Sequence, residues 1–501
     1  MKKAKLIIDK DFIISEVDEK LFGSFVEPLG RCVYGGIYEP GHQAADKNGF
    51  RLDVLELTKA LNVTLNRFPG GNFVASYRWE DGVGPKELRP VRPELAWQSI
   101  EPNTFGLNEM VEWSKLNGSD IMMTVNLGTR GIEQALDLLE YCNFKEGTYY
   151  SDLRISHGYK KPHAFKYWCL SNEADGIWQV GQKTGYEYGR LARETSKAMK
   201  LLDNSIKTVL AGSSAPSQDT FPVFDAEALD QSYEFVDYLS VHSYLSNPEN
   251  DTSNYLAKTL TTDEFFKSVI ATCDYIKAKR RSNKTMKISF DEYNTWNKNS
   301  KERFENRWTF APPLLEQIYT MEDAVVLGGL LITILKYADR IEIACLSELV
   351  NCISHIRTEN GGGCWTLPPY YTFLLFSKHA RGTALYPVIE SPRYDSQQYT
   401  DVPYVDAVAT MDQDENITIF AINRDLENSL ILETDMRGFK DYRLIEHIVL
   451  EAAGPKDTNT KDNPGKVAPH SNGDTVIDGG KVQAKLPRLS WNVIRLEKLN
   501  N

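Results

Sequence analysis

The sequence predicts an α/β fold, a (β/α)8 TIM barrel that carries an additional antiparallel, jelly-roll-like β-sandwich. Between about residues 20 and 350, eight short apolar runs alternate with longer segments of helical periodicity. After about residue 380, strand-like runs follow one another across turns, with no helical pattern between them. A doubly wound open sheet is the alternative for the first part, but the GG of PGGN (69–72) does not form the GxGxxG loop typical of that fold.

The predicted barrel strands are short, apolar and bounded by polar or turn residues. They are LFGSFVEP (21–28), VTLNRFPGG (63–71), DIMMTVNLG (120–128), FKYWCLSNE (165–173), KTVLAGSS (207–214), VDYLSVHSY (236–244), MKISFDEYN (286–294) and IEIACLSE (341–348). The predicted helices between them include RLDVLELTKALN (51–62), IEQALDLLEYCN (132–143), GYEYGRLARETSKAMKLLD (185–203) and DEFFKSVIATCDYIKAKRR (263–281). Because parallel neighbours need a long crossover, usually a helix, the alternation favours parallel strands.

The sandwich is predicted from the strands of the last third of the chain. They are YVDAVATMDQ (404–413), NITIFAINRD (416–425), SLILETDM (429–436), YRLIEHIVLE (442–451) and SWNVIRLEKL (490–499). The polar, turn-rich segment at 452–474 is expected to be an exposed loop. We therefore predict three parts: residues 1–18 as N-terminal strands that join the sandwich, 19–380 as the catalytic barrel, and 381–501 as the C-terminal sandwich.

The charge and composition of the chain argue against several classes of partner and location. The 501 residues carry a net charge of −12, which argues against nucleic acid and anionic membranes, since both favour a basic face. The N-terminal segment lacks the apolar region of a secretory signal, and the apolar run at 324–335 is too short to span a bilayer. The seven Cys are scattered without a CxxC pair. We expect a cytoplasmic protein with buried thiols, no metal and no cofactor.

Polar side chains end nearly every predicted barrel strand, where the carboxyl ends of the strands form the rim that carries barrel active sites. These residues are Glu27, Arg67, Asn72, Asn126, Asn172, Glu173, His242, Tyr244, Asp291, Glu292 and Glu348. Crowding several carboxyl groups together is unfavourable, because each disfavours ionisation of the others. A purely structural rim would have little reason to contain such a cluster.

Glu173 and Glu292 form the candidate catalytic pair. They end predicted strands four and seven, which lie across the mouth of an eight-stranded barrel from each other. Two such carboxyl groups suit glycoside hydrolysis, where a separation of about 5–5.5 Å implies retention and about 6.5–9.5 Å implies inversion. For either Glu alone, a rim salt bridge is the simpler explanation. Together, with Asn172 before one and Tyr293 and Trp296 after the other, they favour catalysis.

Over essentially its full length the chain resembles family 51 glycoside hydrolases, the intracellular bacterial α-L-arabinofuranosidases. The matching segments are FGSFVEPLGR (22–31), RFPGGNFVASYRWEDGVGP (67–85), LAWQSIEPNTFGLNE (95–109), VNLGTRG (125–131), YWCLSNEADGIWQVG (167–181), SFDEYNTW (289–296) and APPLLEQIYTMEDA (311–324). Several long motifs in the right order are more specific than an isolated Asn-Glu pair.

The resemblance implies residue roles. Glu173 matches the acid/base and Glu292 the nucleophile, while Arg67 and Tyr244 match groups beside the nucleophile. The residues matched to the sugar hydroxyls are Glu27, Asn72 and Asn172, and those that resemble sugar-facing walls are Trp97, Trp178 and Trp296. For Trp97 and Trp178 a place in the core remains the alternative. Asn172 is expected to donate its amide NH₂ to the sugar 2-hydroxyl, a contact that strengthens in the transition state.

Two departures from the family pattern lie close to these residues. Ser171 stands before the Asn-Glu pair, where the family usually has Gly. In SELVNCISH (347–355), Glu348 replaces a sugar-contacting Gln of the family, and an ion pair between Glu348 and His355 is one expectation. Further differences occur after strand seven (EYNTWN, 292–297) and at CWTLPPYYTF (364–373). They leave the expected mechanism intact and the exact substrate open.

The resulting hypothesis is an exo-acting, retaining α-L-arabinofuranosidase. It would remove terminal non-reducing residues from arabinan, arabinoxylan or imported arabino-oligosaccharides by double displacement. A second enzymatic hypothesis is another retaining glycosidase of the same clan, a β-xylosidase or an endoglucanase. A third is a catalytically inactive sugar-binding protein, which the presence of both Glu173 and Glu292 argues against. The resemblance also implies a homo-oligomer, often a hexamer.

Overall fold

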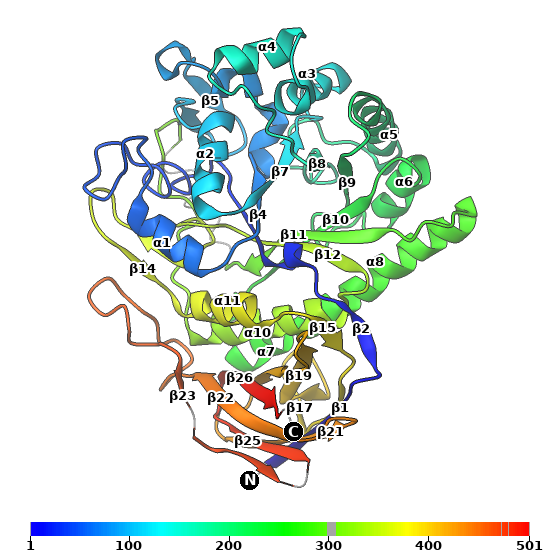
Figure 1. Ribbon diagram of the computed structural model, residues 1–501, viewed down its shortest axis with the longest axis vertical. Coiled ribbons are helices and arrows are strands. Elements are labelled where there is room, and N and C mark those ends of the chain that lie inside the picture. Colours follow the sequence, from blue (N-terminus) through cyan, green and yellow to red (C-terminus); the bar gives the residue numbers. More distant parts are fainter. Residues whose placement is uncertain (1, 298–306, 472, 479, 500–501) are drawn as a thin grey trace.

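The computed structural model describes residues 2–297, 307–471, 473–478 and 480–499. Eight parallel strands close into a barrel in the order β10-β11-β12-β3-β4-β7-β8-β9 (Figure 1). Their bounds are β3 Gly23–Phe25, β4 Leu65–Phe68, β7 Asp120–Val125, β8 Tyr167–Leu170, β9 Lys207–Ala211, β10 Tyr238–Leu245, β11 Lys287–Thr295 and β12 Ile341–Leu346. Each lies within or overlaps one predicted strand, so the predicted fold class is confirmed.

Helices surround the barrel because each crossover must return the chain to the start of the next parallel strand. They are α1 Leu52–Ala60, α2 Leu107–Asn117, α3 Ile132–Asn143, α4 Tyr149–Ser156, α5 Gly185–Leu202, α6 Val223–Ser232, α7 Thr252–Ala257, α8 Thr259–Arg280, α10 Met321–Lys336 and α11 Pro368–His379. Local sequence sets their ends. Thr184, for example, caps α5 by accepting from the backbone N–H of Glu187, whose carboxylate accepts from the backbone N–H of Thr184.

Among the described residues of the barrel there are also two short hairpins and four 3-10 turns. The hairpins are β5 Arg92–Glu94 with β6 Ser99–Glu101 and β13 Ile356–Thr358 with β14 Cys364–Thr366. The turns are η1 Glu19–Phe22, η2 Asn72–Ser76, η3 Trp79–Gly82 and η4 Lys86–Leu88. Most of these elements follow the carboxyl ends of β4 and β12, so they build the side of the barrel that carries the candidate residues.

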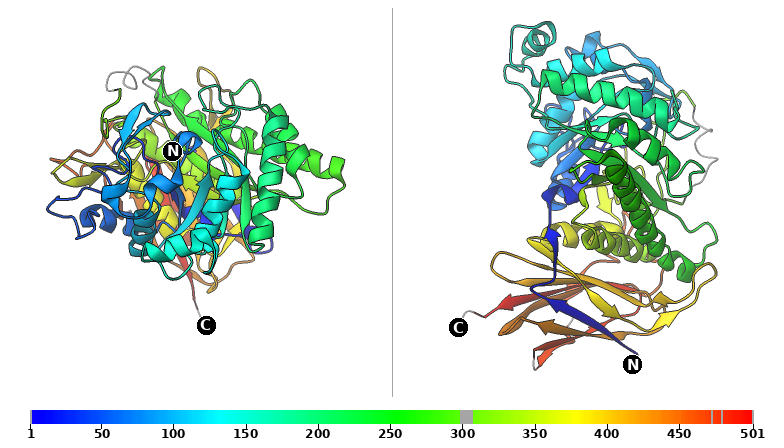
Figure 2. Two further views of the ribbon diagram at one scale, coloured as in Figure 1. Left: turned by 90° about the horizontal axis from the view of Figure 1, so that it is seen from above. Right: turned by 90° about the vertical axis from the view of Figure 1, so that its right-hand side faces the viewer.

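The rest of the described chain forms a two-sheet sandwich below the barrel (Figures 1 and 2). One sheet has the order β16-β1-β21-β25-β24, and the other β2-β15-β19-β20-β26-β22-β23. The strands are β1 Lys2–Asp9, β2 Ile13–Glu16, β15 Thr383–Leu385, β16 Val388–Glu390, β19 Val405–Met411, β20 Ile417–Asn423, β21 Leu430–Arg437, β22 Tyr442–Leu450, β23 His470–Ser471, β24 Thr475–Asp478, β25 Lys481–Leu486 and β26 Ser490–Lys498. A small hairpin, β17 Arg393–Tyr394 with β18 Val402–Pro403, lies beside it.

The N-terminal strands pair with both sandwich sheets. β1 runs parallel to β21 and antiparallel to β16, and β2 pairs with β15. The five predicted C-terminal strands are present, whereas β15, β16, β23, β24 and β25 were not predicted, and β23 lies within the segment 452–474 that was predicted as a loop. The domain boundaries at residues 18 and 380 stay a prediction.

Helices α10 and α11 lie between the barrel and the sandwich (Figures 1 and 2). α10 contains the predicted apolar run at 324–335. Every residue of this helix except Lys336 is buried. Gly328 lets the sandwich approach, because a Cβ there would lie 2.5 Å from the Trp491 ring. Within the described ranges, no helix is both long and apolar enough to cross a membrane.

Candidate active site

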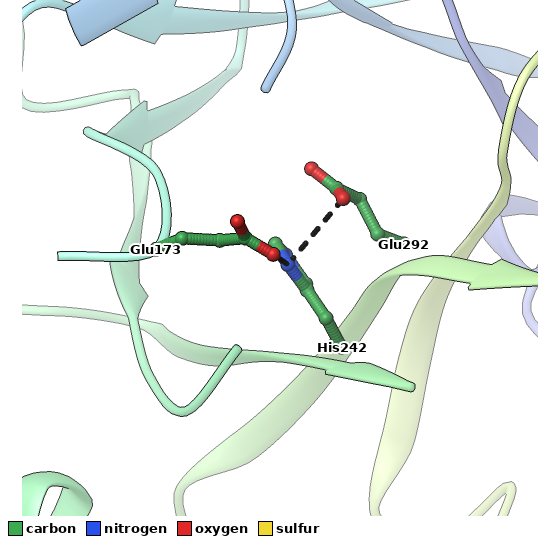
Figure 3. Close-up of side chains that lie close together, drawn as sticks. All are labelled: Glu173, His242 and Glu292. Atoms are coloured by element: carbon green, nitrogen blue, oxygen red, sulfur yellow. Dashed lines mark hydrogen bonds and ion pairs between the residues drawn. The ribbon is translucent and has the colours of Figure 1, made fainter. Parts of the chain in front are cut away.

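Glu173 and Glu292 meet at the carboxyl end of the barrel with His242 between them (Figure 3). Glu173 follows the end of β8, His242 lies in β10, and Glu292 lies in β11. One oxygen of each carboxyl group and one imidazole nitrogen all lie within 4.8 Å of one another. Both residues are buried, with exposures of 7% for Glu173 and 5% for Glu292. The predicted pair is therefore brought together in a largely dry site.

His242 links three carboxylates. Its Nδ1 lies 3.0 Å from Glu173 Oε1 and 3.5 Å from Glu292 Oε2, and its Nε2 lies 3.3 Å from Asp291 Oδ1. Burial alone would lower the pKa of His242, but the Glu292 charge and the bonds to Asp291 and Glu173 raise it to about 10. Its imidazole is therefore a cation at neutral pH and neutralises part of the acidic cluster.

The potential ligand atoms of Glu173, His242 and Glu292 converge as they would around a metal ion. A metal ion requires the neutral imidazole, with a free lone pair on the ligating nitrogen. Both ring nitrogens of His242 are instead engaged with carboxylates, Nδ1 with Glu173 and Nε2 with Asp291. We interpret the cluster as charge-paired side chains.

Arg67, from β4, holds Glu292 in place. Its Nη1 donates to Glu292 Oε1 at 2.6 Å, and its Nη2 donates to Asn172 Oδ1 at 2.6 Å. Tyr244, two residues after His242, donates its hydroxyl to Glu292 Oε2 at 3.0 Å. Both oxygens of Glu292 thus accept hydrogen bonds, one of them from a buried cation. This environment favours an ionised carboxylate with a fixed direction.

Asp291 contacts both cations of the site, Arg67 and His242. Burial would raise its pKa, but the Arg67 charge and the hydrogen bond from His242 bring it below the usual range. Its Oδ2 lies 3.5 Å from Arg67 Nε, and its Oδ1 accepts from Ser240 Oγ at 2.5 Å. Asp291 therefore remains charged and fixes the two cations that face the candidate catalytic pair.

Glu173 accepts hydrogen bonds at both oxygens. His242 Nδ1 lies 3.0 Å from Oε1, and Trp178 Nε1 donates to Oε2 at 2.8 Å. These contacts fix the orientation of the Glu173 carboxyl group. Trp178 is 41% exposed, so it lies on the solvent side of Glu173, whereas Trp296 packs edge-on against Tyr244 with ring centroids 5.4 Å apart.

The predicted sugar-binding residues form two adjoining groups. Asn172 Nδ2 donates to Asn72 Oδ1 at 3.2 Å, and Arg67 fixes the orientation of the Asn172 amide from its other side. Glu27 Oε1 accepts from the backbone N–H of Phe73 at 2.7 Å and from Trp97 Nε1 at 2.8 Å. Trp97 is buried and touches the site through this bond.

Glu348 is buried close to Glu27, but the expected ion pair with His355 is absent. His355 Nε2 lies 3.1 Å from Asn294 Oδ1 instead. Burial lowers the pKa of His355 to about 3, so its ring is neutral and offers no charge to a carboxylate. The two residues are close in sequence, yet the chain turns His355 toward β11.

Comparison with known proteins agrees with this geometry. Two family models match: the alpha-L-arabinofuranosidase 1 domain over residues 57–260 and the alpha-L-arabinofuranosidase C-terminal domain over residues 291–490. The intracellular exo-alpha-(1->5)-L-arabinofuranosidase of Halalkalibacterium halodurans is 53% identical over 99% of each chain, and intracellular exo-alpha-(1->5)-L-arabinofuranosidase 1 of Bacillus subtilis is 51% identical over 99% of this chain and 100% of that one. A solved family 51 alpha-L-arabinofuranosidase from Bifidobacterium longum has a TM-score of 0.95 at 40% identity, with 99% of each chain covered.

The chain belongs to the family 51 α-L-arabinofuranosidases. The resemblance identified from the sequence motifs is thereby confirmed. The roles assigned to individual residues stay predictions that the contacts above support.

His242 and Asp291 carry no assigned role in the sequence-based prediction of this arabinofuranosidase site. A signal for His242 was present, because residues two apart on a strand share a face and Tyr244 was already a candidate. Asp291 is harder to predict, since it neighbours Glu292 and should point the opposite way. The pairing of β11 with β12 shifts register between Phe290 and Tyr293, and this irregularity brings both carboxylates to Arg67.

Ser171, the other departure from the family pattern, has a left-handed backbone conformation with φ of 82°. Glycine adopts that conformation without a steric penalty, whereas a Cβ is disfavoured there. The family preference for Gly at this position therefore has a backbone cause. In this chain Ser171 occupies the same turn at a cost in strain.

Proposed function

We propose that this protein is an exo-acting, retaining α-L-arabinofuranosidase that hydrolyses terminal non-reducing α-L-arabinofuranosyl residues. The observation that carries the proposal is the pair of carboxyl groups with one oxygen of each within 4.8 Å of the other. That spacing suits direct attack by a carboxylate, because inversion needs about 6.5–9.5 Å between the groups to admit a water.

In the first step, we assign Glu292 as the nucleophile that attacks the anomeric carbon. Arg67 and Tyr244 hold its two oxygens, so it is charged and aimed before substrate arrives. Glu173 donates a proton to the leaving oxygen as the bond breaks. His242 Nδ1, 3.0 Å from Glu173, is placed to share that proton.

In the second step, Glu173 acts as the base. It accepts a proton from water while that water attacks the arabinosyl–Glu292 ester, and the configuration at the anomeric carbon is restored. The hydrogen bonds from His242 and Trp178 stabilise the carboxylate needed at this stage. The NH₂ of Asn172, oriented by Arg67, is assigned to the sugar 2-hydroxyl.

The proposed substrates are short α-(1→5)-linked arabino-oligosaccharides, with terminal residues of arabinan and arabinoxylan as longer ones. This preference rests on the relatives named intracellular exo-alpha-(1->5)-L-arabinofuranosidase. The same names support a site of action inside the cell. A net charge of −12 remains unfavourable for nucleic acid or an anionic membrane as partners.

A panel of aryl glycosides tests the activity. The α-L-arabinofuranoside should be hydrolysed, with the β-xyloside and β-glucoside slower by about 10²-fold or more, since several contacts to the furanose would be lost. Preference for the β-xyloside, or activity confined to polymers, would favour the alternative β-xylosidase or endoglucanase. No hydrolysis of any member, with binding of arabinose retained, would favour an inactive sugar-binding protein.

A homo-oligomer, with a hexamer as the form implied by the family resemblance, stays a prediction. Light scattering coupled to size-exclusion chromatography tests it directly. A mass near six times the 56.9 kDa chain would support the hexamer, and a mass equal to one chain would contradict any oligomer.

A further inference from the structure

Glu348 is a buried carboxyl group that the proposed mechanism does not use. The backbone around it is fixed between two barrel strands, since Ser347 N–H donates to Tyr293 O at 3.1 Å and Leu349 N–H donates to Phe25 O at 3.0 Å. β11, which contains Tyr293, carries Glu292, and β3, which contains Phe25, leads into Glu27. Glu348 therefore enters the site between the nucleophile and a predicted sugar-binding carboxyl group.

The surroundings of Glu348 offer it no cation. The residue is 3% exposed, and no salt bridge to it is found within the described part of the chain. The ionisable groups that face it are Glu27 from the β3 end, Glu292 from β11 and the thiol of Cys32, which hydrogen bonds to it. Among the described residues, its Oε2 has no hydrogen-bond partner. One oxygen of a buried carboxyl group is thus left without a protein partner.

The two cations of the site are already engaged by other carboxylates, without Glu348. The two cations, Arg67 and His242, contact the carboxylates of Asp291, Glu292 and Glu173. No further cation contacts Glu27 or Glu348 in the described ranges, and a buried carboxylate without a cation is strongly disfavoured. Burial, with lesser contributions from neighbouring carboxylates, raises the pKa of Glu27 to about 8 and holds that of Glu348 well above its usual range.

We propose that Glu348 works as a neutral carboxylic acid that donates a hydrogen bond to a hydroxyl of the bound sugar, so that loss of its proton at alkaline pH weakens substrate binding. A protonated carboxyl group has one O–H donor and one acceptor oxygen, the same pattern that a side-chain amide presents. Ionised Glu348 would retain acceptors alone and would stand beside the charge of Glu292. This inference rests on the proposed function, because the ligand is the arabinofuranosyl unit.

Calorimetry of L-arabinose binding tests the proposal without relying on turnover. Titrations of the wild type from pH 6 to 10, each in two buffers of different ionisation enthalpy, give the Kd and the protons taken up. Above the pKa of Glu348, the Kd should rise about tenfold per pH unit, with uptake of up to one proton by this group per sugar bound. A constant Kd up to pH 10 without proton uptake would overturn the proposal.

The variant Glu348→Gln tests whether the proton taken up on sugar binding belongs to Glu348. Its amide keeps a donor but cannot ionise, so binding at pH 6 should stay within about threefold of the wild type and the Glu348-dependent loss at high pH should disappear. Glu101→Gln is the matched control, because Glu101 is another buried carboxyl group, with its pKa raised to about 7 mainly by burial, that hydrogen bonds to Tyr34 outside the site. The control should keep the wild-type pH dependence of binding.

The outcomes separate this inference from the proposed function. If Glu348→Gln keeps the full wild-type loss of affinity and proton uptake, Glu348 is not the titrating group and the inference fails. If the wild type binds no arabinose at pH 6, the proposed function itself fails. Should Glu348→Gln not fold, Glu348→Asp supplies the variant: it keeps an ionisable group, so retained proton uptake with weaker binding supports the inference, and loss of pH dependence overturns it.

Discussion

At the scale of single residues, hydrogen bonds distinguish the two catalytic candidates. Glu292 accepts from the Arg67 cation, whereas Glu173 contacts His242 and the partly exposed Trp178. A carboxylate paired with a buried Arg is suited to remain ionised, while one next to a histidine and solvent is suited to exchange protons. The roles therefore follow from different surroundings of the same side chain.

Glu173→Ala should separate substrates by their leaving groups. An aryl arabinofuranoside with an acidic phenol needs no proton on departure, so its cleavage step should fall far less than that of an arabino-oligosaccharide, which should lose about 10²–10⁴-fold. Single-turnover rates on both substrates make the measurement. Equal losses on the two would contradict the acid/base assignment. Glu292→Gln, in contrast, should lose at least about 10⁴-fold on both.

Ser171→Gly should stabilise the protein. A residue with a Cβ pays about 1–2 kcal/mol for a left-handed backbone such as that of Ser171, at φ 82°, and Gly does not. The greater backbone entropy that Gly loses on folding offsets about 0.5–1 kcal/mol of this gain. A net gain of about 0.5–1 kcal/mol should appear as a higher midpoint of thermal unfolding. Ser243→Gly, at a buried position in β10, is the control and should lower the midpoint. A lower midpoint for Ser171→Gly would show that the turn tolerates serine without strain.

At the scale of secondary structure, the turn after β4 shows how backbone shape positions a side chain. A Cβ at Gly71 would lie 2.4 Å from Glu27 Oε2, and a Cβ at Gly70 would lie 2.7 Å from the Glu27 side chain. Two residues after Gly71, the backbone N–H of Phe73 donates a hydrogen bond to the Glu27 carboxyl group. The PGGN sequence is therefore needed for close approach to a carboxyl group, although it is not a phosphate loop.

Gly71→Ala should reduce kcat/KM while leaving the barrel folded. The added methyl group would displace Glu27, and misplacement of a site residue by about 1 Å can cost about 10²-fold. Steady-state kinetics on the aryl arabinofuranoside measure the loss, and thermal unfolding reports on the fold. Gly131→Ala is the control, because a Cβ at Gly131 meets nothing within 4 Å. Wild-type kinetics for Gly71→Ala would contradict the fit between this turn and Glu27.

The sequence predicted the regular elements well because each obeys a simple period. The eight barrel strands are continuous apolar runs, since parallel strands are covered on both faces, and the four named helices occur with ends shifted by a few residues. β24 and β25 were missed because their polar alternation lies next to a turn-rich segment. The strand alternation could have indicated the position of His242, but its positive charge depends on three carboxylates from other positions in the chain, and the position of Asp291 depends on a register shift that no local pattern encodes.

At the scale of the whole molecule, the sandwich is fastened to the barrel through buried contacts. Arg424, at the end of β20, donates to Leu256 O and to Thr259 Oγ1 of the barrel helices. Phe376 of α11 meets Phe420 of β20 with ring centroids 5.8 Å apart. These contacts join the sandwich to the barrel helices, so we expect them to act on the stability of the protein.

Gly328→Ala should destabilise the protein, although the same change in an exposed helix stabilises it by about 1 kcal/mol. Overpacking against Trp491 and Ile422, whose atoms would lie 2.5 and 3.0 Å from the new Cβ, should cost about 1–3 kcal/mol. The half-life of activity at elevated temperature measures the effect, with Gly363→Ala as a control in open space. A longer half-life than the wild type would show that the junction can relax.

The stereochemistry of the first-formed product tests the central claim most directly. Proton NMR of an aryl α-L-arabinofuranoside digest, recorded before mutarotation, identifies the anomer released. With one oxygen of Glu173 and one of Glu292 within 4.8 Å of each other, we predict α-L-arabinofuranose, the product of double displacement. Initial release of the β-anomer would mean single displacement by water and would contradict the assignment of Glu292 as nucleophile.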